Sequence, residues 1–155
     1  MDEKYGFAPV PSVLDWGDLR LDLDVAWSFD RFNSLTRAEA LDRLKEGFGI
    51  DFLDDFLFLP EEVFSYCFPA LIELALELKT EELFRHQDFI REFFILVDAR
   101  IFRSSGCPAR WWPTLGPALK RLADAQAACG FDVTIDENYG LRWAAWDQAT
   151  WAEGC

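Results

Sequence analysis

The sequence predicts a mainly helical α+β fold, in which a helical body carries a small three-stranded antiparallel sheet made of an N-terminal strand and a C-terminal hairpin. Two observations predict the fold. Apolar residues recur at helical spacing between capping residues through most of the chain. Near each end, in 19–25 and 131–145, apolar and polar residues alternate with the period of a strand. Such a sheet, covered on one side by helices, is a stable layered arrangement.

One domain, residues 1–155, is expected from the length of the chain. Domains cluster at roughly 100 to 150 residues. Hydrophobic residues make up 51% of the sequence and aromatic residues 16%, a composition unlike that of disordered chains. The chain is therefore expected to fold around its own core.

The first predicted strand covers residues 19–25. Its apolar positions alternate with polar ones, so one face is expected to be buried and the other, with Asp22 and Asp24, to lie in water. Trp27, just beyond this strand, is expected in the core. The apolar positions are Leu19, Leu21, Leu23 and Val25.

Helices are predicted from residue 36 to residue 79. Thr36 followed by Glu39 has the spacing of a capping box and predicts a helix that ends at Gly47 and Gly49. Residues 51–58 have helical spacing and a face of acids. Pro60 suits the first position of another helix, which Pro69 is expected to kink or split.

The rest of the chain is read as two helices and the hairpin. Thr80 caps a long central helix that extends to Ile101. Trp111, Trp112 and Pro113 predict a turn, and Thr114 restarts a helix that ends at Gly130. In 131–145 the alternation around residues 138–140 predicts a hairpin, with Trp143 in the core.

The charge of the chain limits its partners. A formal net charge of −13 repels phosphate backbones, so nucleic-acid binding is disfavoured, and it attracts basic proteins. The alternative is that acidity serves solubility alone. We expect no membrane partner and a cytoplasmic location. The first 14 residues lack the pattern of a signal peptide, no apolar run approaches the ~18 residues of a span, and four scattered cysteines suit a reducing compartment.

No catalytic motif accompanies the titratable residues, so we expect a protein that is not an enzyme and needs no cofactor or metal. His86 is the only histidine, and no nucleophile motif accompanies it. Gly47 and Gly49 follow a helix and lack the pattern of a phosphate-binding loop. The alternative use of the carboxylates is a metal-dependent active site, against which stands their role as a solvated acidic face.

The candidate partner-binding residues are acids that would steer a basic partner and tryptophans that would anchor it. For Trp111, Trp112, Trp146 and Trp151, core and interface are equally open. The predicted set is Asp22, Asp24, Asp51, Asp54, Asp55, Glu61, Glu62, Trp111, Trp112 and Trp146.

Residues 58–70 carry a resemblance to a known group of proteins. They read F-L-P-E-E-V-F-S-Y-C-F-P-A, which is similar to a segment F-L-P-E-x-x-F-x-Y-x-x-P-A of immunity-type proteins from bacterial polymorphic toxin and type VI secretion systems. The resemblance covers under a tenth of the chain and transfers no catalytic residue. It implies a protein that neutralises a cognate toxin by covering or distorting its active site. The alternatives are a small metal-dependent hydrolase or transferase and an adaptor subunit of a larger assembly.

Overall fold

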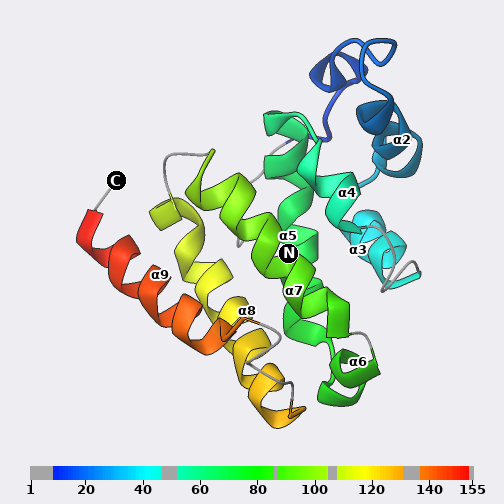
Figure 1. Cartoon of the computed structure of the whole chain (residues 1–155). Helices are drawn as coiled ribbons and strands as arrows, with labels where there is room; N and C mark the ends of the chain where they lie inside the picture. Colours follow the sequence, from blue (N-terminus) through cyan, green and yellow to red (C-terminus); the bar gives the residue numbers. More distant parts are fainter. Residues whose placement is uncertain (1–8, 47–51, 86, 105–107, 131–136, 154–155) are drawn as a thin grey trace. The chain divides into compact units, whose positions relative to one another are not determined.

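The computed structural model describes residues 9–46, 52–85, 87–104, 108–130 and 137–153, and this part of the chain is helical without any strand (Figure 1). The chain forms two compact units, Met1–Leu74 and Ala75–Cys155. The elements are η1 (Val13–Trp16), α2 (Leu23–Phe32), α3 (Arg37–Glu46), α4 (Phe52–Leu57), α5 (Glu61–Glu77), α6 (Thr80–Arg85), α7 (Gln87–Val97), the π-helical turn η2 (Asp98–Phe102), α8 (Pro108–Ala128) and α9 (Tyr139–Glu153). No helix in these ranges combines the length and the hydropathy needed to cross a bilayer.

The predicted α+β fold is wrong, and the first strand is the start of a helix. A side-chain oxygen of Asp22 accepts hydrogen bonds from the backbone N–H groups of Asp24 and Val25 at 3.0 and 3.1 Å, so Asp22 caps α2. Leu21 and Leu23, which the alternation assigned to a buried face, are 85% and 83% exposed. The alternating pattern arose from a cap and the first turn of a helix.

The second half of the predicted hairpin is also helical. Leu141, Trp143 and Ala145 lie in α9, whose first turn is capped by Asn138, because its Oδ1 accepts a hydrogen bond from Leu141 N at 3.1 Å. The first half of the hairpin, in 131–136, lies outside the described residues. The turn predicted at Trp111 and Trp112 is wrong too, since α8 runs through both residues.

One further helix prediction needs adjustment. α5 runs without a break through Pro69, so the proline does not split it. The described residues of the predicted central helix from Thr80 are helical, as α6, α7 and the π-helical η2, and His86 lies outside the described residues. By contrast, the capping box is confirmed: Glu39 N donates to Thr36 Oγ1 at 3.3 Å and Thr36 N donates to the Glu39 carboxylate at 2.8 Å.

A chain of phenylalanine rings forms the core of the first unit. Phe32 of α2 meets Phe56 of α4 edge to face at 5.7 Å between ring centroids. Phe56 then meets Phe64 of α5 at 6.3 Å, and Phe64 stacks on Phe68 at 4.7 Å. Such aromatic pairs add about 0.5–1.5 kcal/mol each beyond the area that they bury. The rings therefore fasten the inner face of α2 to α4 and α5.

Aromatic side chains also fill the second unit, where α9 lies alongside α8 (Figure 1). Phe94 of α7 stacks on Tyr139 at 4.4 Å and on Trp146 at 5.6 Å. Trp146 stacks in turn on Phe102 at 4.5 Å, and Phe102 meets Trp112 of α8 edge to face at 6.1 Å. The aromatic residues of α9 thus join α7, η2 and α8 in one core.

Hydrogen bonds from buried indoles hold α9 on α8. Trp112 Nε1 donates to Asp147 Oδ1 at 2.7 Å, and Trp143 Nε1 donates to the backbone oxygen of Gly116 at 3.1 Å. These bonds satisfy the polar ends of large side chains, which would otherwise be costly to bury.

Candidate partner-binding surface

Large apolar side chains are exposed at the N-terminal end of the first unit. Leu14 is 89% exposed and Trp27 is 66% exposed, together with the two leucines at the start of α2. The expectation that Trp27 lies in the core is therefore wrong. Scattered exposed leucines are common, but an exposed tryptophan beside an exposed leucine on one helix is the kind of surface that interfaces use. The exposed apolar side chains of this segment are Val10, Val13, Leu14, Leu21, Leu23 and Trp27.

α2 presents two faces of different character. Its inner face buries Val25, Ser28 and Phe32 against the rest of the unit. Residues three and four apart share one side of a helix, so Leu23, Trp27 and Asp30 form a stripe on the opposite, solvent side. All three are exposed, and we call them the outer stripe of α2.

The inner face of α2 is fixed firmly enough to hold the outer stripe in place. Trp16 of η1 packs edge to face on Phe29 at 5.2 Å. Ser28 Oγ donates to the backbone oxygen of Asp55 at 3.2 Å, and Arg31 Nη1 lies 2.6 Å from Asp55 Oδ2. A side chain carried by a well-anchored helix is pre-organised, which lowers the entropic cost of binding.

Acidic side chains lie at both ends of the outer stripe, which itself includes Asp30. Asp22 and Asp24 are exposed at the N-terminal turn of α2, and Asp30 is exposed near its C-terminal end. The two arginines of this segment pair with other carboxylates: Arg20 Nη2 lies 2.9 Å from Asp18 Oδ2, and Arg31 pairs with Asp55. Hydrogen bonds from the Arg20 side chain and backbone hold the pKa of Asp18 below its usual range. The acids of the stripe therefore give this surface a negative potential.

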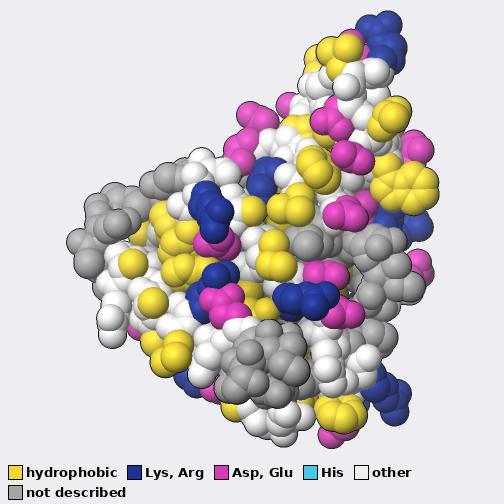
Figure 2. Space-filling model, viewed as in Figure 1, with side chains coloured by type: hydrophobic (Ala, Val, Ile, Leu, Met, Phe, Trp, Pro, Cys, Tyr) yellow, Lys and Arg dark blue, Asp and Glu magenta, His cyan; other side chains and the backbone are white. Residues whose placement is uncertain are grey.

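Figure 2 shows hydrophobic and acidic side chains intermingled over the first unit, on the part that carries α2. Interfaces commonly combine apolar anchors with a polar rim. The outer stripe and its flanking acids have this composition on a single helix.

The other predicted acids have different surroundings. Asp54 is exposed on α4, and Glu61 and Glu62 are exposed in the first turn of α5, where the helix dipole favours them. Asp55 is 2% exposed, so its carboxylate holds the unit together instead of facing solvent. Asp51 lies outside the described residues.

The predicted tryptophans lie mostly in the core of the second unit. Trp111 and Trp112 are 7% and 4% exposed and so offer little surface to a partner. Trp146 is half-buried in the aromatic core. Trp143, also on α9, is half-buried and donates a hydrogen bond to Gly116 of α8. Sequence reasoning missed Trp27 as the exposed anchor. The sequence did hold a signal for this exposure. If residues 23–32 are recognised as a helix capped by Asp22, the spacing of four residues places Trp27 on the same side of the helix as Leu23.

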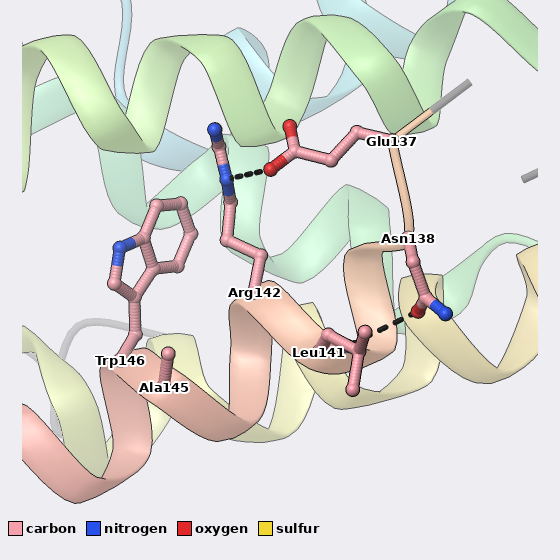
Figure 3. A pocket seen from close by; sticks show the side chains of 6 residues that line it. All are labelled: Glu137, Asn138, Leu141, Arg142, Ala145 and Trp146. Atoms are coloured by element: carbon pink, nitrogen blue, oxygen red, sulfur yellow. Dashed lines mark hydrogen bonds and ion pairs between the residues drawn. The ribbon is translucent and has the colours of Figure 1, made fainter. Parts of the chain in front are cut away.

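The second unit carries a shallow pocket of about 460 Å³ along α9 (Figure 3). Its two charged groups pair with each other, since Arg142 Nε lies 2.5 Å from Glu137 Oε1. The Arg142 guanidinium also lies 5.3 Å from the centre of the Trp146 ring. The pocket is lined by Glu137, Asn138, Leu141, Arg142, Ala145 and Trp146.

Within the described ranges, no group of three or more His, Cys, Asp or Glu side chains is arranged to hold a metal ion. The strongest candidate site in this part of the molecule is thus the surface of α2.

Comparison with protein-family models, with curated proteins and with solved structures found no match to this chain. The inference about function accordingly depends on the surface of the molecule and on its sequence.

Proposed function

We propose that this chain is a non-enzymatic protein-binding domain whose partner docks on the outer stripe of α2 and its flanking acids. The observation that carries the proposal is the exposure of Trp27, at 66%, beside Leu23 on a helix whose inner face is packed against the rest of the unit. Tryptophan is over-represented among the residues that dominate binding energy, and its area is large for the entropy it loses. The acids around it favour a basic protein.

The proposed partner is a cognate bacterial toxin, which the chain neutralises in the cytoplasm by covering its active or substrate-binding surface. The support is the resemblance of residues 58–70 to immunity-type proteins and the net charge of −13. Three of the four aromatic residues of that segment, Phe64, Tyr66 and Phe68, are buried, whereas Phe58 is 44% exposed, so most of its aromatic side chains contribute to the core of the first unit. Free Cys67 and Cys129 suit a reducing compartment.

The test is binding to the protein encoded by the neighbouring gene, measured by calorimetry, with survival of cells that express both proteins as a second readout. Trp27→Ala is expected to weaken binding about 30-fold, because truncation of such an anchor costs ~2 kcal/mol. The matched control is Leu141→Ala, which alters a 70% exposed apolar side chain on α9 and is expected to leave affinity within about twofold.

Three results would contradict the proposal. The first is the absence of a complex and of protection. The second is a rise in melting temperature with Mg²⁺, Mn²⁺ or Ca²⁺, which would favour the metal-dependent enzyme, since a metal that binds only the native state stabilises it. The third is constitutive association with several host proteins, as an adaptor subunit would show.

A further inference from the structure

We infer that the segment of the partner that occupies the outer stripe is cationic, with an apolar anchor between two groups of lysine or arginine. This inference rests on the proposed protein-binding function and adds the chemistry of the partner. It is carried by the position of the acids relative to the apolar side chains on α2.

The acids bracket the apolar part of the stripe along the helix axis. Asp22 and Asp24 lie at its N-terminal end, Asp30 lies toward its C-terminal end, and Trp27 is midway between Asp24 and Asp30. At 1.5 Å per residue, Asp24 and Asp30 are separated by about 9 Å along the axis. A complementary segment therefore presents an apolar side chain to Trp27 and Leu23, with cations on either side that are separated by at least about 9 Å.

The charge of the surface argues against other occupants. A second copy of this chain also carries a net charge of −13, so two outer stripes would repel each other. Phosphates of nucleic acids and of anionic lipids are repelled for the same reason. The arginines that would attract an anion, Arg20 and Arg31, are already paired with Asp18 and Asp55.

The experiment titrates three synthetic peptides into the isotope-labelled full-length chain. Binding is measured from the changes in the backbone amide chemical shifts of the chain. The first has two leucines bracketed by lysines, the second has glutamate in place of each lysine, and the third keeps the lysines and has serine in place of each leucine. The first is expected to bind with shifts centred on residues 21–31. The glutamate peptide is expected to leave the spectrum unchanged, and the serine peptide to bind about tenfold more weakly.

Charge-reversal variants distinguish binding of the peptide at the outer stripe from general attraction of a cationic peptide to an acidic protein. Asp24→Lys with Asp30→Lys is expected to weaken the lysine peptide about tenfold or more. The matched control, Asp42→Lys with Glu81→Lys, changes the net charge equally at exposed positions on α3 and α6 and is expected to have a much smaller effect. The inference would be overturned by an equal loss of affinity in the two double variants, or by chemical-shift changes spread over the second unit. It would also be overturned if the glutamate peptide bound as tightly as the lysine peptide.

The toxin itself distinguishes this inference from the function on which it rests. A toxin that binds the wild-type chain, and binds the Asp24→Lys, Asp30→Lys chain equally well at every salt concentration, would overturn the cationic segment and leave the protein-binding function standing. A toxin that does not bind the wild-type chain would contradict the proposed function itself.

Discussion

Arg31 Nη1 lies 2.6 Å from Oδ2 of Asp55, whose side chain is only 1% exposed. The pair joins α2, which carries the outer stripe, to α4. An ion pair at this distance is attractive, and a buried pair is screened less by solvent than an exposed one. Asp55, which sequence reasoning assigned to a partner, thus helps to hold α2, the helix of the proposed binding surface, in place.

Removal of Arg31 is expected to destabilise the chain. Arg31→Met leaves a buried carboxylate without its cation, at a cost of about 3 kcal/mol in the free energy of unfolding, measured with urea. The control Arg43→Met, at an exposed position of α3, should stay within about 0.5 kcal/mol. A double variant that also carries Asp55→Leu should regain much of the loss, and equal destabilisation by the single and double variants would contradict a role for the ion pair.

Gly116 of α8 makes room for an indole. A Cβ at this position would lie 3.1 Å from Nε1 and Cε2 of Trp112, whose Nε1 donates to Asp147 on α9. Gly116→Ala is expected to displace the indole and lower the free energy of unfolding by about 1–2 kcal/mol. In Gly140→Ala the nearest atom, at 3.2 Å, is Oδ1 of Asn138, which caps α9 through Leu141 N; this terminal atom can shift, so the expected loss is smaller, at no more than about 1 kcal/mol. The free energies of unfolding of both variants, measured by urea denaturation, are compared. A loss in Gly116→Ala no larger than that in Gly140→Ala would contradict a stabilising role for the close packing of Gly116 against Trp112.

Trp27 is the most exposed of the tryptophans whose side chains are described, and acids lie around it. At constant ionic strength, Cs⁺ should quench its fluorescence more than I⁻ does, relative to the same ions acting on N-acetyltryptophanamide, because the local potential is negative. Trp27→Phe should remove much of this difference and change the free energy of unfolding by no more than about 0.5 kcal/mol. Quenching that survives Trp27→Phe unchanged would place the accessible indole elsewhere.

Cys67 is a buried thiol on α5. Burial raises its pKa from 9.0 to about 12, and the charge of Arg37 opposes this only in part. At pH 8 its alkylation, followed by mass spectrometry, should therefore be slow and should speed up with urea as the chain unfolds. Between pH 9 and about 12 the folded thiol keeps its proton while the unfolded one loses it, so stability should fall as pH rises. In Cys67→Ala this fall should be smaller.

Local signals in the sequence predicted several helix boundaries because caps act through neighbouring residues. The capping box from Thr36 to Glu39 spans only four residues, and it is found as expected. The alternation at 19–25 failed because Asp22 can serve either as the polar face of a strand or as a helix cap. The hydrogen bonds from Asp24 N and Val25 N to Asp22, together with the exposure of Leu21 and Leu23, show that it is a cap.

The residues that lie on the surface were also predicted only in part. Asp22 and Asp24 were correctly placed in solvent, since charged side chains are seldom buried without a partner. Asp55 has such a partner in Arg31, which is 24 positions away in the sequence and is brought close only by the packing of α2 on α4. Trp27 could not be assigned to the surface without knowing which side of α2 packs inward.

The division between the two units falls inside a helix. The first unit ends at Leu74 and the second begins at Ala75, and both residues are buried in the uninterrupted α5. Arg121 of α8 then bonds the carbonyl groups of Ala75 and Leu78 at the end of the helix. Independent modules are usually joined by exposed linkers that proteases cut and recombination exchanges. Here the division lies within a helix, and a cut there would leave peptide groups of that helix without their hydrogen-bond partners. We therefore expect that neither half would fold stably when expressed alone.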